Sequence, residues 1–586
     1  MPILPCIERA INALLHFQQD NGSWSGRLSV NLAPSADVLI LHRYYELGTS
    51  DIERELLPPI LDTQNEDGGW SAYPGGASDP STTAEIALGL SLCVNPPQGA
   101  LDKAQAFVQS RGGIAKTFFT IRMLYALFRK GQRFRIPRIP LWTTWLPPGV
   151  GLMSLPSWAR MLALSIVLIE DSLRKTPLAN RARARAIETL RLHQDRNGSW
   201  YGMFTPTFLA LMALRRQGFK PTDPTVQWGL RFIRSLQTKR ENGIVQERCQ
   251  AKIWETALAL DVLRLSGMGD DHPAVRRAID YLALHQIWHP HALKWANKNP
   301  TGGWAFEEDN TLFPDTDDTS AALLALANVK NEREAEIERQ VLRGVGWLLR
   351  QQNPHGGFGA FDQEIRGGIL EWGAKTWGYL YGADRRWMWY CRTRDMATAD
   401  VTGHALEALI AGGLTPSRRE IGIALDFLIT SQTKSGAWRG RWGVGPIYGT
   451  SMALRGLRNA GISKPNPCIF KAVAWLKSIH RPDGGWGEPP ESLWKQELWG
   501  AGPSNPTQTA WAILGLVAAG EAEAQEVVKG VEYLCRTQRE DGFWDEPFPT
   551  GVLMPPDCFL GYELYPLIYP LMALIKVRNA REAPIT

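Results

Sequence analysis

The sequence predicts an all-α protein assembled from repeated helix–turn–helix units. A recurring motif, a recurring spacing and helical periodicity around each copy support this prediction. In the motif, a Gly follows a Gln by four residues and a Trp follows the Gly by two. Copies lie at Gln18/Gly22/Trp24, Gln64/Gly68/Trp70, Gln194/Gly198/Trp200, Gln432/Gly436/Trp438 and Gln538/Gly542/Trp544, with altered copies at Gln352/Gly356/Phe358 and His480/Gly484/Trp486.

The spacing and the flanking segments indicate what each copy does. Gln18 and Gln64 are 46 residues apart, a period typical of repeated supersecondary units. Apolar residues around the copies have the spacing of amphipathic helices, and Asn-Gly or Asp-Gly supplies the turn. We expect the Gly to reverse the chain, the Trp to lie across the end of the next helix, and the Gln amide to bond exposed backbone groups. Most of these Trp residues are therefore predicted to be structural.

Composition limits the class of protein. The 586 residues are 44% hydrophobic and 21% charged, enough for two or more globular domains. The 24 Trp exceed both the 14 Tyr and the 19 Phe, which suggests a scaffold of indoles, a cavity lined by aromatic rings, or both. The net charge of +5 comes without a basic tract containing aromatics, so no nucleic-acid partner is expected.

Cysteine usage and the chain's apolar segments predict where the protein works. The seven cysteines are scattered and include no CxxC pair, which favours reduced thiols in the cytoplasm and predicts no metal site. The N-terminus MPILPCIERAINALLHF lacks the pattern of a signal peptide, and no apolar run has spanning length. Any membrane contact is expected to be peripheral.

The segment PTGGWAFEEDNTLFPDTDDTSAALLAL, residues 300–326, carries the most distinctive acidic cluster. Asp315, Asp317 and Asp318 are close enough to raise one another's pKa, so we expect one of them to hold a proton. The alternative is that the cluster caps a helix beginning near Thr319, because Asp and Thr accept hydrogen bonds from backbone amides there. The cluster alone does not distinguish the two.

Several motifs together resemble the squalene-hopene cyclases, a branch of the class II terpene cyclases. They are the Gln/Gly/Trp repeats, the acidic segment, DVTGHALEAL, GAWRGRWGVGPIYGTS, NPTQTAWAILGL and DCFLGYELY, and the resemblance runs from about Gln18 to Tyr565. It implies two α/α barrels of the βγ type, one inserted into the other. Residues 1–28 plus 249–586 would form the catalytic barrel, and residues 29–248 the second. The resemblance implies no cofactor.

The resemblance also assigns roles to residues. Asp317 would protonate an alkene, which requires an unusually strong acid, and Asp315 and Asp318 would shape its field. His404 would pair with the donor and increase its acidity. Tyr448 would belong to the same hydrogen-bonded network, with Asp395 and Asp400 as supporting carboxylates.

Carbocations formed after protonation need a dry cavity with aromatic walls. The family positions for such walls are matched by Trp158, Trp254, Phe306, Phe361, Trp442, Tyr562 and Tyr565. Packing in an ordinary hydrophobic core is the alternative for each of them.

Four departures from the family concern the later steps of the reaction. Cys558 and Met554 replace aromatic residues, and Phe204 and Thr205 stand where the family has a Gln-Pro pair. The span between Trp158 and Trp254 is short, and residues 363–394 form an expansion rich in aromatic and basic residues. Its Lys375, Arg385 and Arg386 are candidates for binding a phosphate head group.

The sequence thus predicts an enzyme that protonates the terminal alkene of a linear isoprenoid polyene and cyclises it. Because the later positions are altered, we expect a shorter or head-group-bearing prenyl chain rather than simple hopene formation. The alternatives are a squalene or triterpene cyclase proper and a class II prenyl diphosphate cyclase. A zinc-dependent prenyltransferase subunit and a non-catalytic repeat scaffold also share such repeats.

Overall fold

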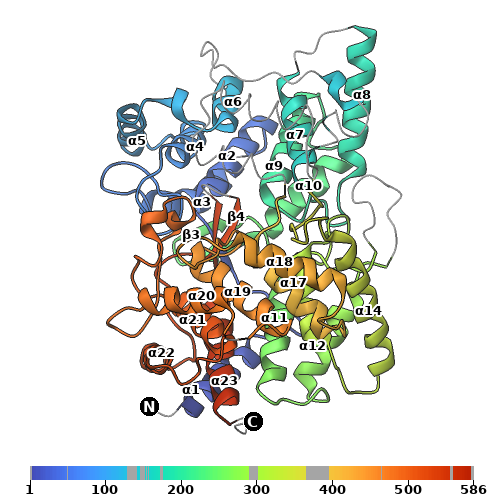
Figure 1. The fold of residues 1–586 in the computed structure, drawn as a ribbon. Helices are drawn as coiled ribbons and strands as arrows, with labels where there is room; N and C mark the ends of the chain where they lie inside the picture. The colour runs from blue at the N-terminus through green and yellow to red at the C-terminus, as the bar shows by residue number, and fades with distance from the viewer. Residues whose placement is uncertain are drawn as a thin grey trace.

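The fold is predominantly helical, as expected (Figure 1). The computed structural model describes residues 3–48, 50–128, 141–145, 152, 155, 157–171, 176–288, 301–364, 395–463, 465–554 and 558–582. Figure 1 shows two helical lobes, with helices α2 to α10 in one and α11 to α23 in the other. None of the helices in these ranges combines the length and the apolar character needed to cross a membrane.

Within the described chain, six inner helices of the larger lobe form a closed ring. Each contacts the next, and the last contacts the first. Most side chains of these inner helices are buried. Each helix is covered by the two adjacent inner helices, and its remaining inward face points into the ring. The helices are α11 (Lys252–Leu265), α13 (Thr316–Leu326), α17 (Ala399–Ala411), α19 (Gly445–Asn459), α21 (Pro506–Ala518) and α23 (Tyr565–Glu582).

Outer helices surround this ring, and most lie across two inner neighbours. They bury one face only, as their amphipathic sequences require. The first outer helix comes from the N-terminus and contacts α22 and α23, so the two ends of the chain meet (Figure 1). The described outer helices are α1 (Ile3–His16), α12 (Pro273–Leu284), α14 (Glu334–Gln351), α18 (Arg419–Ser431), α20 (Pro467–Ser478) and α22 (Gln525–Thr537).

The smaller lobe has the same two-layer arrangement in its described part. Inner helices contact in the order α6, α4, α2, α9 and α7. Their bounds are α2 (Ala33–Tyr45), α4 (Pro80–Ser91), α6 (Phe119–Phe128), α7 (Ser157–Glu170) and α9 (Phe204–Arg216). The outer helices are α3 (Ser50–Asp62), α5 (Gln98–Ser110), α8 (Pro177–Leu192) and α10 (Pro224–Ser235).

Two small antiparallel sheets and four 3₁₀ helices complete the described fold. One sheet has the order β1-β5-β4 and joins the chain near residue 28 to its C-terminal part; the other pairs β2 with β3. The strands are β1 (Leu28–Ser29), β2 (Gln237–Arg240), β3 (Gly243–Gln246), β4 (Gly551–Met554) and β5 (Cys558–Tyr562). The 3₁₀ helices are η1 (Ile114–Lys116), η2 (Leu141–Trp145), η4 (Pro490–Leu493) and η5 (Gln496–Leu498).

The buried hydrophobic residues form two large clusters. One takes its members from residues 6–30 and 249–577, and the other from residues 33–236 with Leu312 and Phe313. We propose that these are the cores of two domains, residues 1–28 plus 249–586 and residues 29–248. Leu312 and Phe313 belong to the first domain by sequence but pack into the second core, just ahead of the acidic cluster.

The motif around Trp438 shows how each repeat holds two layers of helices together. The Gln432 amide donates to Gly436 O and to Cys468 O of the next outer helix, both at 2.8 Å. The Trp438 indole donates to Leu428 O (2.7 Å), near the end of the preceding outer helix. The Trp438 backbone amide donates to Thr450 Oγ1 (3.0 Å) on the following inner helix. Other copies repeat these bonds, which confirms the structural role.

The indole differs from expectation in one respect, because it bonds the end of the preceding helix rather than the next one. A further unit also escaped the sequence pattern. Gln286 donates to Gly302 O and Gln340 O, both at 2.9 Å, and the Trp304 indole donates to Leu282 O (2.7 Å). Sixteen residues separate Gln286 from Gly302 instead of four, so the motif was hidden by an insertion.

Candidate active site

The candidate site lies where the N-terminal ends of neighbouring inner helices meet. Asp315 precedes α13 as its N-cap, and Asp317 and Asp318 are in its first turn. Asp400 is in the first turn of α17, and Tyr448 is in the first turn of α19. Free backbone N–H groups and helix dipoles favour negative charge at this end of a barrel. The ring thus gathers acidic groups at one end.

Asp315 and Asp318 form a buried carboxyl pair. Asp315 accepts a hydrogen bond from the Asp318 backbone amide at 2.8 Å, so it does cap the helix. Burial raises the pKa of Asp315 to about 7. Burial, together with the negative charge of Asp315, raises the pKa of Asp318 well above its usual value. Burial therefore favours the protonated form of both carboxyls, and a proton shared within the cluster stays a prediction.

Asp317 has a different environment from its two neighbours. Its Oδ1 lies 2.9 Å from Nδ1 of His404, and its side chain is 13% exposed. The His404 side chain is only 2% exposed and its ring stands edge-on to Trp254, with the centroids 5.9 Å apart. The structure therefore brings the expected acid and histidine together from two helices, 87 residues apart in sequence.

An imidazolium at His404 would make Asp317 a stronger acid. It would donate its Nδ1 proton to Oδ1 and so stabilise the carboxylate that remains after Asp317 gives up its own proton. In such a pair the proton on Asp317 would be the one transferred, and the proton on Nδ1 of His404 would stabilise the carboxylate left behind.

The two supporting carboxylates hold backbone loops rather than the acid itself. Asp395 accepts bonds from the backbone amides of Ala360, Phe361 and Asp362, and lies 3.4 Å from Arg441. Burial raises its pKa to about 6.

Asp400 accepts from the backbone amides of Arg441 (2.7 Å) and Trp442 (3.1 Å). Its pKa is raised, first by burial and then by Asp317. The rings of Phe361 and Trp442 meet edge to face with centroids 5.9 Å apart. Asp395 and Asp400 therefore position two of the predicted wall residues.

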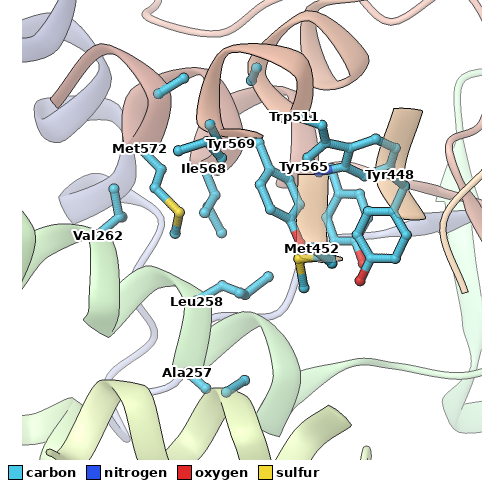
Figure 2. Close-up of a cluster of buried hydrophobic side chains, with 14 of the residues drawn as sticks. Ala257, Leu258, Val262, Tyr448, Met452, Trp511, Tyr565, Ile568, Tyr569 and Met572 are labelled. Atoms are coloured by element: carbon cyan, nitrogen blue, oxygen red, sulfur yellow. The ribbon is translucent and has the colours of Figure 1, made fainter. Parts of the chain in front are cut away.

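Aromatic side chains from several elements gather beside the acid. The Trp254 indole donates to the Tyr565 hydroxyl at 2.9 Å, and Tyr565 stacks on Tyr562 with centroids 3.9 Å apart. Figure 2 shows the rings of Trp511, Tyr565 and Tyr448 grouped together, with Tyr569 beside them. Such π-faces attract a cation without supplying a strong nucleophile.

Tyr448 contacts the aromatic cluster through its ring. It lies 4.7 Å from Trp511, and the described contacts include no hydrogen bond between its hydroxyl and the Asp317–His404 pair. Burial and the charge of Asp317 raise its pKa well above the usual value, so it stays neutral. The predicted hydrogen-bonded role of Tyr448 is not seen in this arrangement.

The remaining predicted residues lie in several places. Phe306 is half-buried against the larger core, and Cys558 is buried on β5. Phe204 stacks with Phe208 in the smaller lobe, and Trp158 is on α7 of the same lobe. Three predicted cations, Lys375, Arg385 and Arg386, lie outside the described residues, as does the side chain of Met554.

A buried polar cluster in the smaller lobe was missed from the sequence. Asp37 on α2 has a pKa raised well above its usual value by burial and by Glu85, while Arg248 opposes the shift. Arg248 donates to Thr205 Oγ1 (3.0 Å) and to Asn31 Oδ1 (3.3 Å). The sequence signal that could have revealed this cluster is a carboxylate within each of two apolar inner helices, Asp37 in α2 and Glu85 in α4. In the described ranges, no group of three His, Cys, Asp or Glu side chains is placed to hold a metal ion.

Comparison with known families decides the class. The models of the squalene-hopene cyclase C-terminal and N-terminal domains match residues 250–579 and residues 7–180 and 167–242, respectively. The chain belongs to the squalene-hopene cyclase family. It is an enzyme, a class II terpene cyclase, as the sequence predicted.

Relatives and a solved structure agree with this assignment. The squalene–hopene cyclase of Alicyclobacillus acidocaldarius is 31% identical over 98% of both chains. Dammaradiene synthase of Dryopteris crassirhizoma is 28% identical, over 98% of this chain and 94% of the relative. The structure of ent-copalyl diphosphate synthase from Streptomyces platensis covers 99% of this chain and 100% of its own, with a TM-score of 0.52 and 17% identity. That likeness shows a shared fold.

The carboxyl pair predicts how the cyclase activity depends on pH. Above about pH 7 Asp315 ionises and adds a negative charge beside Asp317, which makes proton transfer from Asp317 harder. We expect kcat/KM to fall about tenfold between about pH 7 and about pH 9. Asp315→Asn should lack this decline, because Asn caps a helix as well as Asp but cannot ionise. The same decline in both proteins would show that another group titrates.

Proposed function

We propose that this class II terpene cyclase starts its reaction by transferring a proton from Asp317 to the terminal alkene of a linear isoprenoid polyene. The observation that carries the proposal is the 2.9 Å contact between Asp317 and the buried His404. The π electrons of the alkene form the new C–H bond and leave a tertiary cation. Ring closure then uses the other alkenes of the chain as internal nucleophiles.

The surrounding residues support this sequence of steps. Asp395 and Asp400 fix Phe361 and Trp442 through backbone hydrogen bonds. Trp254, which lies edge-on to His404 and donates to Tyr565, and the stacked rings of Tyr562 and Tyr565 add further π-faces. A cation enclosed by rings is stabilised and is protected from water until the cascade ends.

We further propose a substrate that is shorter than squalene or carries a polar head group. Cys558 and Phe204 alter positions at which the resemblance places residues for the later cations and for termination. Beside Phe204, Arg248 is bonded to Thr205, and a guanidinium can also bind phosphate or hydroxyl oxygens. The two alternatives are a squalene or other triterpene cyclase and a class II prenyl diphosphate cyclase.

Incubation with a panel of substrates tests the proposal. Squalene, C15 to C25 prenyl diphosphates and the free prenyl alcohols would each be supplied, and extracted products analysed by mass spectrometry. A cyclised product from a free prenyl alcohol supports the substrate proposal. A product from squalene alone supports the triterpene cyclase alternative. A cyclised product that retains its diphosphate supports the class II prenyl diphosphate cyclase alternative. Folded protein that cyclises none of them contradicts the proposed function.

A further inference from the structure

The larger barrel has a cavity at the end opposite to Asp317. Its walls come from four successive inner helices, α17, α19, α21 and α23, and include the last turns of α19 and α21. The volume is about 260 Å³, far more than the roughly 10–15 Å³ that one water molecule needs. Asn459 on this wall is exposed, so solvent reaches the cavity. The cavity is therefore large enough and open enough to take a small dissolved ligand.

The charged side chains of the cavity wall are mostly cationic. In the described chain, Arg455 and Arg458 on α19 and Lys576 on α23 face one carboxylate, Glu407 on α17. Asp261 lies nearby without lining the cavity; burial raises its pKa, and Lys576 and Arg455 oppose the shift. Because a raised pKa favours the neutral form of Asp261, this residue offsets the cations less than an ordinary aspartate would. The wall therefore carries an excess of positive charge.

The carboxylate of the wall is already paired with one of these cations. Arg455 Nη2 lies 2.7 Å from Glu407 Oε2, and each side chain is 10% exposed. The Asn459 amide donates to Glu407 Oε1 at 3.3 Å and to the Arg455 backbone carbonyl at 2.9 Å. Burial raises the pKa of Glu407, but the positive charges around it, Arg455 first, outweigh burial and hold the pKa below its usual value. Glu407 is thus an anion that neutralises Arg455 and leaves the other two cations.

Arg458 and Lys576 have no carboxylate partner among the residues that the structure describes. Arg458 uses Nε and Nη1 to bond Ala518 O (2.8 Å) and Ile462 O (3.3 Å), and its Nη2 makes no further bond within the described chain. Lys576 makes neither a hydrogen bond nor an ion pair with a described residue. Both side chains are half-buried, so each has lost part of its water without gaining a counter-ion.

Capping of helix ends accounts for Arg458 but not for Lys576. The carbonyl ends of α19 and α21 attract cations, and Arg458 bonds a carbonyl group at the end of α21. Lys576 lies inside α23, before its last turn, and bonds no carbonyl group of the described residues. Its ammonium group is therefore solvated by water or by an anion from solution. An unused guanidinium N–H group on the same wall favours the anion, because charge-assisted hydrogen bonds are the stronger ones.

We propose that this cavity binds a small anion that carries a phosphate group, such as inorganic phosphate or diphosphate. Lys576 supplies a point charge, and Arg458 Nη2 supplies a directional donor for a phosphate oxygen. Phosphate near neutral pH also keeps a proton on an oxygen, and this P–OH group can donate to the Glu407 carboxylate. A sulfate ion has no such proton. Glu407 therefore selects phosphate over sulfate.

The anion site is separate from the position proposed for the polyene. A smaller cavity of about 10 Å³, roughly the space of one water molecule, lies between it and His404, and Arg455 lines both cavities. Leu258, Met452 and Tyr569 line the smaller cavity and approach one another in Figure 2. A prenyl chain cannot pass through a space of this size, so the ligand is a free anion and not the head group of a polyene. Anion binding here is independent of the proposed proton transfer.

Isothermal titration calorimetry of the full chain with inorganic phosphate, diphosphate and sulfate at about pH 7 tests the site. Phosphate or diphosphate should bind saturably to the wild type, with sulfate about tenfold weaker or more. Lys576→Met keeps the aliphatic part of the side chain and removes its charge, so phosphate affinity should fall about tenfold or more. Lys529→Met, an exposed lysine on α22, is the matched control and should bind as the wild type does. Phosphate should also raise the thermal unfolding temperature of the wild type, but not that of Lys576→Met.

Glu407→Gln tests the selectivity separately and serves if Lys576→Met does not fold. A neutral amide can donate to either anion, so the preference for phosphate over sulfate should disappear in this variant. The anion site is overturned if folded wild type binds neither phosphate nor diphosphate, or if folded Lys576→Met binds phosphate as tightly as the wild type. Sulfate binding as tight as phosphate in the wild type, or an unchanged preference in Glu407→Gln, overturns the phosphate assignment. Cyclisation of polyenes by the wild type is measured separately, so failure of the anion site leaves the proposed function intact.

Discussion

Asp317→Asn is expected to reduce cyclised product by about 10⁴-fold or below detection, because an amide cannot donate a strongly acidic proton to an alkene. Product formation by the purified variant, followed by mass spectrometry under substrate-saturating conditions, measures this. The Asp317 side chain is 13% exposed and does not cap α13, a role that belongs to Asp315. The thermal unfolding temperature should therefore change little.

A matched carboxyl variant controls for the loss of charge alone. Asp545 has an 80% exposed side chain, and Asp545→Asn should retain wild-type activity. His404→Gln should lower kcat more than it raises KM, because the ring stabilises the carboxylate that is left after proton transfer. An Asp317→Asn protein that is folded and still active would show that a different group donates the proton.

Trp438→Ala should cost about 3–5 kcal/mol of unfolding free energy, the largest stability change that we predict. The side chain is fully buried, and its removal opens a cavity between α18 and α19. It also removes the indole bond that satisfies Leu428 O near the end of a helix. Denaturant unfolding monitored by circular dichroism gives the value.

Two other substitutions serve as comparisons for Trp438→Ala. Trp438→Phe keeps most of the buried ring, so its cost should be smaller; Phe358 fills the equivalent place of another repeat and is also fully buried. Trp142 has 51% of its surface exposed, and Trp142→Ala should cost less than about 1 kcal/mol. If Trp438→Ala is no more costly than Trp142→Ala, the repeat is not the structural unit that we describe.

The helical repeats were predictable because their signal is local. Gln, Gly and Trp recur at fixed short spacing, and each bonds within its own turn or to an adjacent helix. The unit at Gln286 was missed because its turn carries an insertion, although Trp304 makes the same bonds. Closure of the ring was not predictable from residue pattern. It depends on contacts between α11 and α23, more than 300 residues apart.

The site was predictable in part. The acidic cluster indicated a shared proton, and the structure divides the roles: Asp315 caps the helix and Asp317 contacts His404. The buried ion pair between Glu407 and Arg455 was missed because its two members come from different helices. Its spacing from His404 and Tyr448 was visible in the sequence. The partners across the barrel were not, because they depend on helix packing.

Deuterium incorporation tests the central claim most directly. The enzyme would be equilibrated in D₂O and given the polyene that it cyclises, and the product analysed by mass spectrometry and NMR. Proton transfer from Asp317 predicts deuterium on the less substituted carbon of the original terminal alkene, next to the carbon that becomes the tertiary cation, and no such product from Asp317→Asn. A cyclised product without deuterium there, or one formed by loss of a diphosphate, would contradict the account.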